Sequence, residues 1–217
     1  MKIENNLPPS QKEKKGVALL NKAYELALNG IPNVTEPLNN VVYSYLSKTR
    51  DREEAIKSFI LHQKIKCSTT GFITGLGGLI TLPVTLPADM ASSLYIELRM
   101  IAAIAMIRGY NVHDDQVKTA IFLCLAGNAV GDVIKQAGIK SIEKIVIKKL
   151  LPKLTGDIIK NINKKVGFRL LTRAGSKGFI NLTKAVPILG GVISGGWNWG
   201  EVSLYANYAK KIFNENK

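Results

Sequence analysis

The charge of this chain is concentrated in a few segments, and this segregation constrains the fold more than any single motif. Residues 67–88 contain no charged side chain, whereas residues 135–183 contain twelve Lys or Arg and only two Asp or Glu. Most of the formal net charge of +14 therefore lies in one block. Such a chain can bury its uncharged runs and expose a positive field that attracts phosphate, either in lipid or in nucleic acid.

Apolar residues recur with the spacing of helices, and no segment alternates with the period of two that a half-buried strand requires. We therefore predict an all-α, multi-helix bundle with two Gly-rich apolar hairpin segments and a basic amphipathic helical region. Residues 1–15 are expected to form a flexible tail, and residues 16–217 a single helical domain. The predicted helices cover residues 16–28, start near Thr35, Arg50, Leu86 and Asp114, and include a basic helix over residues 139–151.

Glycines four residues apart occur in both uncharged parts of the chain. This spacing makes a flat stripe on a helix, so that a second backbone can approach closely. A glycine in a helix interior costs about 1 kcal/mol, so the stripes predict either close packing inside a soluble bundle or insertion into a membrane. The pairs are Gly71 with Gly75, Gly191 with Gly195, and Gly196 with Gly200.

Polar residues form a stripe on the apolar helix that is predicted to start near Leu86. Asp89, Ser93 and Glu97 are spaced four residues apart, and Arg99 follows. Charges in the middle of this apolar run argue against a simple two-span membrane hairpin. Two interpretations remain open for the stripe: an internal polar track or binding groove, and a structural ion pair or solvent-facing edge.

Two blocks of this sequence resemble the signatures of the EcsC family, and the resemblance covers about residues 60–213. The first block reads Leu86-Pro87-Ala88-Asp89, then Leu98-Arg99-Met100-Ile101-Ala102, then Gly109-Tyr110-Asn111; the second reads Ala185-Val186-Pro187-Ile188-Leu189-Gly190-Gly191, then Gly195-Gly196 and Asn198. The resemblance implies a bacterial origin and a mostly helical fold. It also suggests a membrane protein or transporter as a partner, since the family is named for a protein encoded beside an ABC transporter. It brings no catalytic residues.

The basic block predicts a surface that binds anionic lipid. Lys140, Lys144 and Lys148 share one side of the predicted helix 139–151, and apolar residues occupy another side. The alternative is an ordinary solvated helix face. Few aromatic side chains interleave with the cations, and no nucleic-acid-binding module is present, so nucleic acid is the weaker alternative. The candidate lipid- or phosphate-binding residues are Lys140, Lys144, Lys148, Lys149, Lys153, Lys160, Lys164, Arg169 and Arg173.

No pattern in the sequence predicts catalysis. The two histidines, His62 and His113, have no second ligand at metal spacing, and no serine lies in a nucleophile-elbow pattern. We therefore expect no catalytic residue, no metal and no cofactor. The two cysteines, Cys67 and Cys124, lie in apolar runs and favour a reducing compartment.

These observations favour a non-enzymatic, membrane-associated helical protein in an accessory or interaction role. We expect it on the cytoplasmic face, peripheral to the inner membrane, since no signal-peptide pattern follows the first lysine. The expected partner is an anionic membrane surface, and self-association remains open. A membrane-permeabilising, toxin-like protein and a nucleic-acid-binding helical protein are the alternatives, together with a soluble enzyme whose site the sequence hides.

Overall fold

The protein is all-α, as predicted. The computed structural model describes residues 8–67, 88–139, 147–175 and 199–214. These residues contain no β-strand, only one isolated bridge between Ile31 and Thr35. The helices are α1 (Pro9–Asn29), α2 (Leu38–Leu46), α3 (Arg52–Cys67), α5 (Ala88–Ile107), α6 (Asp115–Cys124), α7 (Val130–Gln136), α8 (Ile147–Leu150), α9 (Gly156–Gly175) and α11 (Trp199–Ile212), with 3₁₀ turns at Gly127–Ala129 and Leu151–Lys153.

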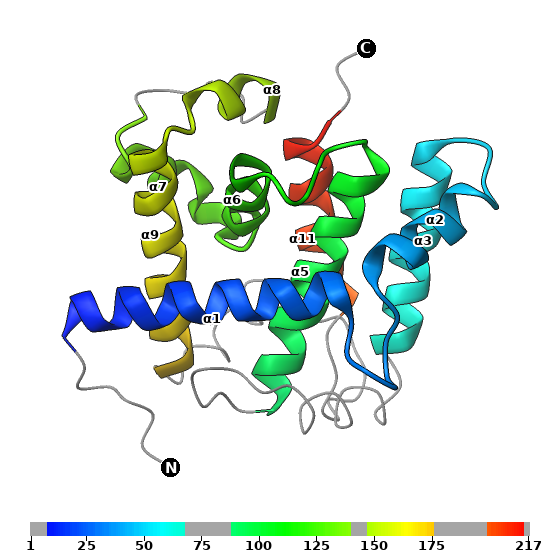
Figure 1. Cartoon of the computed structure of the whole chain (residues 1–217), viewed down its shortest axis with the longest axis horizontal. Coiled ribbons are helices and arrows are strands. Elements are labelled where there is room, and N and C mark those ends of the chain that lie inside the picture. Colours follow the sequence, from blue (N-terminus) through cyan, green and yellow to red (C-terminus); the bar gives the residue numbers. More distant parts are fainter. Residues whose placement is uncertain (1–7, 68–87, 140–146, 176–198, 215–217) are drawn as a thin grey trace.

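Helix α5 is the centre of the bundle. It contacts α1, α2, α3, α6 and α11, and its residues from Leu98 to Ala105 are all buried. A helix that is apolar on every side is stable only when other elements surround it. Figure 1 shows α5 running along the middle of the molecule, with α1 crossing it.

Helix α1 begins earlier than the sequence analysis expected. It starts at Pro9, so residues 9–15 are helical and do not belong to a flexible tail. Proline is favoured in the first turn because it lacks an N–H group that would have no partner there. The predicted end at Asn29 is confirmed: Gly30 follows with φ 79°, and its N–H donates to the Leu26 carbonyl.

Two glycines allow α1 to cross α9 with backbone against backbone. Gly16 and Gly167 are both buried, and a Cβ atom on Gly167 would lie 2.6 Å from the carbonyl carbon of Gly16. The close helix crossing that the structure describes is therefore made by single glycines. The predicted stripes fall mostly elsewhere: Gly71, Gly75, Gly191, Gly195 and Gly196 lie outside the described residues, and Gly200 lies in α11.

The prediction that Thr35 caps α2 is wrong. The helix begins at Leu38, after Pro37. The Thr35 hydroxyl accepts a hydrogen bond from the Ile31 N–H at 2.8 Å and lies 2.6 Å from the Tyr95 hydroxyl of α5. The side chain therefore closes the loop between α1 and α2 and ties it to the central helix, so it is not available to cap α2.

The predicted start and inner face of α3 are confirmed. The helix begins at Arg52, and the preceding Asp51 accepts a hydrogen bond from the Glu54 N–H at 2.7 Å. Ala55, Ile56 and Phe59 are fully buried at helical spacing. The predicted basic helix cannot be followed over residues 140–146, which lie outside the described part; beyond it, α8 is short and continues into a 3₁₀ turn.

Candidate functional site

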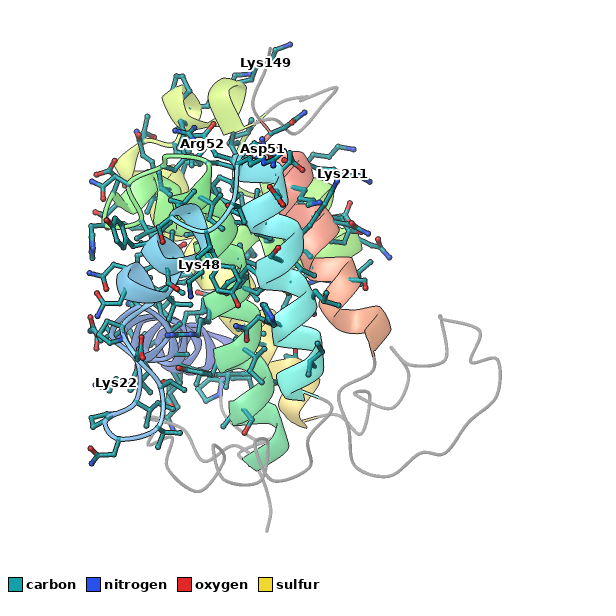
Figure 2. The ribbon with its side chains drawn as sticks, turned by 90° about the vertical axis from the view of Figure 1, so that its right-hand side faces the viewer. Lys22, Lys48, Asp51, Arg52, Lys149 and Lys211 are labelled. Atoms are coloured by element: carbon teal, nitrogen blue, oxygen red, sulfur yellow. The ribbon has the colours of Figure 1, made fainter. Side chains whose placement is uncertain are left out.

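Helices α3 and α11 present exposed apolar side chains beside lysines. Leu61 and Ile65, one turn apart on α3, are 51% and 50% exposed, and Leu204 on α11 is 39% exposed. The two helices lie side by side on one face of the molecule (Figure 2). A groove of about 240 Å³ between them is lined by Leu61, Lys57 and Lys210, among others. We call Leu61, Ile65, Leu204, Lys57 and Lys210 the α3–α11 surface.

The positive charge of this surface is only partly neutralised. Glu53 accepts an ion pair from Arg108 and lies 3.7 Å from the Lys210 ammonium. The pKa of Lys210 is lowered, first because its burial disfavours the charged form, and then because Lys57 and Arg108 repel it. Repulsion among these cations raises the free energy of the isolated protein. An anionic surface that approaches them reduces this repulsion.

Three helix ends lie toward one end of the molecule. Helices α3 and α9 end, and α5 begins, toward the lower end in Figure 1, and Figure 2 agrees. We call these the bordering helix ends, since α3 and α5 flank the stretch 68–87 in the sequence. That stretch and the stretch 185–198, which precedes α11, contain no charged residue. The structure of these stretches themselves is outside the described residues.

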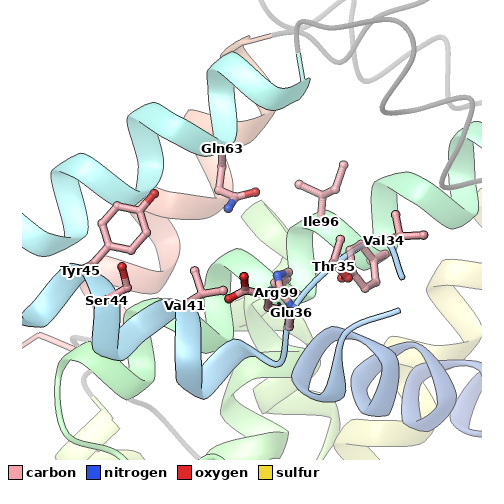
Figure 3. Close-up of a pocket in the computed structure, with 10 residues that line it drawn as sticks. Val34, Thr35, Glu36, Val41, Ser44, Tyr45, Gln63, Ile96 and Arg99 are labelled. Carbon is pink, nitrogen blue, oxygen red and sulfur yellow. Dashed lines mark hydrogen bonds between the residues drawn. The ribbon is translucent and has the colours of Figure 1, made fainter. Parts of the chain in front are cut away.

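A second feature is a polar pocket built around Arg99, which we call the Arg99 pocket. It encloses about 300 Å³ between α2, α3, α5 and the loop before α2. Figure 3 shows Arg99 at its floor and Gln63 reaching into it from α3. The lining residues are Val34, Thr35, Glu36, Val41, Ser44, Tyr45, Gln63, Tyr95, Ile96 and Arg99.

Arg99 joins three segments through backbone carbonyls. Its Nη1 donates to the Ala27 carbonyl at 2.9 Å, and its Nη2 donates to the Glu36 carbonyl at 2.6 Å. Ala27 is in the last turn of α1, where carbonyls lack partners within the helix and the helix dipole favours a cation. Burial lowers the pKa of Arg99, and the neighbouring Tyr95 and Glu36 oppose this effect.

The predicted polar stripe is thereby divided. Glu97 and Arg99 are each only 6% exposed, and Ser93 is half-buried. Asp89 lies in α5, and its side chain is outside the described part. The binding-groove interpretation fits Arg99, which faces a pocket. In the described part of the chain, Arg99 donates to carbonyl groups and not to a carboxylate of the stripe.

Gln63 is a pocket residue that the sequence analysis missed. Its side chain is 94% buried and lies on the same face of α3 as Ile56 and Phe59. An amide at a core-facing position of an amphipathic helix was the available signal, because such positions are normally apolar. Glu36 is a second pocket residue without a signal of its own, because an exposed glutamate before a helix is common in any sequence.

A model of the EcsC protein family matches residues 2–215. The chain belongs to the EcsC family. The match reaches well beyond the expected residues 60–213. It includes α1, whose Ala27 carbonyl accepts from Arg99, and α2, which lines the Arg99 pocket. Comparison with curated proteins and with solved structures gives no match.

The predicted basic residues of this EcsC protein do not form one cluster in the described part. Lys149 and Lys153 are exposed near α8, at the end of the molecule opposite to the bordering helix ends, whereas Lys160 and Lys164 are exposed along α9. Arg169 is half-buried. Lys148 lies in α8 and Arg173 in α9, with side chains outside the described part, and Lys140 and Lys144 lie beyond it entirely.

The described residues of the EcsC protein contain neither a membrane-spanning helix nor a candidate metal site. No helix among them combines the length and the apolar character that crossing a bilayer requires. No three His, Cys, Asp or Glu side chains come close enough together, in that part of the chain, to hold a metal ion.

Proposed function

We propose that this EcsC protein is a non-enzymatic, peripheral membrane protein that binds anionic lipid on the cytoplasmic face of the inner membrane and serves an accessory or interaction role. The observation that carries the proposal is the α3–α11 surface, where Leu61, Ile65 and Leu204 are exposed next to Lys57 and Lys210. Apolar side chains flanked by lysines are typical of helices that lie in a lipid interface.

The energy available from this surface is sufficient for reversible binding. Burying the exposed halves of Leu61, Ile65 and Leu204 contributes about 3 kcal/mol in total, at about 2 kcal/mol for a whole side chain. Lys57 and Lys210 add about 1 kcal/mol each near an anionic membrane. A free energy of about 5 kcal/mol raises the affinity for the membrane more than about a thousandfold above that of a protein surface without these groups.

Two further observations support the proposal. The bordering helix ends lie at one pole, and the uncharged stretch 68–87 connects two of them, the end of α3 and the start of α5, in the sequence. The exposed cations Lys160 and Lys164 of α9 add positive charge along the bundle. The lysines near α8 lie at the opposite end, so the proposal assigns the primary contact to the α3–α11 surface rather than to the predicted helix 139–151.

The test is co-sedimentation of the full chain with vesicles of phosphatidylcholine, with and without phosphatidylglycerol. We expect binding only to the anionic vesicles, and weaker binding as salt rises from 0.1 to 0.5 M, because salt screens exposed charges. The double variant Leu61→Ser/Ile65→Ser removes about 2 kcal/mol of apolar contact and should weaken binding about thirtyfold.

A matched control comes from α2. Tyr43 and Leu46 are 75% and 38% exposed but do not line the α3–α11 groove, so Tyr43→Ser/Leu46→Ser should leave vesicle binding unchanged. Equal loss in both double variants would show that apolar exposure acts nonspecifically and would reject the α3–α11 assignment. No binding of the wild-type chain to anionic vesicles would reject the function itself, and release of an encapsulated dye would favour the permeabilising alternative.

A further inference from the structure

The Arg99 pocket has no part in the proposed contact with lipid, and its chemistry points to a separate ligand. We propose that it binds a small zwitterion, a neutral α-amino acid or a close relative with one carboxylate and one ammonium group. The inference goes beyond the proposed function, because it concerns a soluble small molecule and different side chains.

The floor of the pocket carries a buried cation that forms no ion pair with a carboxylate among the described residues, although the Glu36 carboxylate is near enough to raise the pKa of Arg99. A guanidinium has five N–H donors, and two of those of Arg99 donate to the Ala27 and Glu36 carbonyls. A cation that is 6% exposed is stable only when oxygen atoms surround it. Neutral carbonyls provide part of this compensation, and a ligand carboxylate would complete it with a charge-assisted hydrogen bond.

The wall of the pocket carries an amide that has no hydrogen-bond partner among the described residues. Gln63 is 6% exposed, and none of the hydrogen bonds given for that part of the chain involves its side chain. Figure 3 shows the amide pointing from α3 into the space above Arg99. The amide atoms are not among the fully buried polar atoms without a partner, so they reach the open space of the pocket, where a ligand can bond to them.

The charges that line the pocket define the charge of the ligand. Arg99 contributes one positive charge and Glu36 one negative charge, and the other lining residues are neutral. Glu36 is exposed and Arg99 is buried, so the carboxylate stands toward the mouth and the guanidinium at the floor. A dianion such as a phosphate monoester would meet repulsion from Glu36, whereas a zwitterion can direct its carboxylate to Arg99 and its ammonium to Glu36.

The size and the remaining walls fit a small organic molecule. A cavity of about 300 Å³ is at the lower limit of ordinary ligand sites. Val41 and Ile96 supply apolar contact, and the Ser44 and Tyr95 hydroxyls are polar groups near the same space. Arg99 has a structural role as well, but that role uses only part of its donors and does not require the side chain of Gln63 or of Glu36.

The experiment measures binding of the full chain to matched ligands by isothermal titration calorimetry. Glycine, alanine, serine and valine represent neutral amino acids. Isovalerate is valine without its amine, and isobutylamine is valine without its carboxylate. Comparing valine with these two analogues measures the contribution of each charged group to the affinity. We expect at least one amino acid to saturate the protein, with isovalerate about tenfold weaker than valine. Isobutylamine should not bind measurably, because the Arg99 guanidinium only donates and repels a ligand that has an ammonium group but no oxygen acceptor.

Two variants test the assigned residues without removing Arg99. Gln63→Leu keeps the volume of the side chain and should weaken amino-acid binding about tenfold, the effect of losing one hydrogen bond to a charged group. Glu36→Gln should weaken valine but not isovalerate, and so abolish the preference for the zwitterion. The matched controls are Gln11→Leu and Glu25→Gln, both exposed on α1, and neither should change any affinity.

The proposal is overturned if none of the four amino acids binds, if inorganic phosphate binds more tightly than valine, or if Gln63→Leu binds valine as well as the wild-type chain does. Circular dichroism of each variant checks that the helical fold is retained. Vesicle binding is measured separately, so failure of the pocket does not affect the membrane proposal, and failure of vesicle binding does not affect the pocket.

Discussion

The crossing of α1 and α9 depends on two glycines, and replacing either one by alanine should destabilise the protein. A Cβ atom on Gly167 would lie 2.6 Å from the Gly16 carbonyl carbon and 2.8 Å from the Val17 nitrogen. Both neighbours are backbone atoms, which cannot move aside as a side-chain end can. The two helices would have to separate by roughly 1 Å, which loosens the most extensive helix contact in the described part of the molecule.

The magnitude follows from two opposing effects. Overpacking costs about 1–3 kcal/mol, and more when only backbone can yield. Alanine is favoured over glycine in a helix interior by about 1 kcal/mol. We expect Gly167→Ala to lower the free energy of unfolding by about 2 kcal/mol, which corresponds to a Tm lower by about 4–8 °C for a chain of this length.

Gly131 of α7 provides the matched control. A Cβ atom there would meet nothing within 4 Å, so Gly131→Ala should raise stability by up to about 1 kcal/mol. The measurement is thermal unfolding followed by circular dichroism, with chemical denaturation to confirm the sign. The same substitution should thus act in opposite directions at the two sites. If Gly167→Ala is as stable as the wild-type chain, the two backbones do not approach closely and the reasoning about this crossing is refuted.

Two further predictions concern buried polar groups. Arg99→Met should destabilise the protein by about 2–4 kcal/mol, because the Ala27 and Glu36 carbonyls both lose a charged donor, and Arg99→Lys should recover only part of this loss in denaturation experiments. Burial raises the pKa of the fully buried Cys124 thiol, so in a Cys67→Ser background it should resist a thiol reagent at pH 8 and react only on unfolding; rapid labelling of the native protein would contradict this.

Local signals in the sequence were enough to place several helix ends. Gly30 and Gly109 both have positive φ, 79° and 85°, and each follows the last turn of a helix, where glycine is favoured. Asp51 caps α3 in the same way, as is expected of an acidic residue that precedes a run of helix formers. In each case the residues that make the interaction lie within four positions of one another, so the pattern is visible without knowledge of the fold.

Signals that depend on distant partners could not be read in this way. Thr35 before Glu36 and Pro37 is a good local cap, but its hydroxyl is taken by Tyr95, which is 60 residues away. Gly16 and Gly167 are isolated glycines in the sequence. Their role is visible only in the structure, where a Cβ atom on either one would clash with the backbone of the other helix. The regular glycine spacing drew attention to other segments, because a repeated pattern is easier to recognise than a pair of single residues.

For the same reason, only part of the Arg99 pocket could be predicted from the sequence. Arg99 was selected because a charge in an apolar helix is conspicuous, whereas the acceptors of its hydrogen bonds are carbonyl groups, which carry no sequence signature. The predicted lysine rows were found by spacing alone, and spacing does not reveal which face of the molecule a helix presents. Lys149 consequently lies at the end opposite to the bordering helix ends.

The two proposed sites share helix α3, and this sharing has a thermodynamic consequence. Gln63 points inward to the Arg99 pocket, while Leu61 and Ile65, two positions away on either side, are exposed on the α3–α11 surface. Residues two apart on a helix face in opposite directions, so one and a half turns of α3 contribute to both sites. If occupancy of the pocket changes the position of α3, then a bound amino acid must change lipid affinity by the same factor by which lipid changes amino-acid affinity. Titrating vesicles with and without saturating amino acid measures this factor, and the reverse titration must return the same value. A factor of one would show that occupancy of the pocket does not change the surface that α3 presents to lipid.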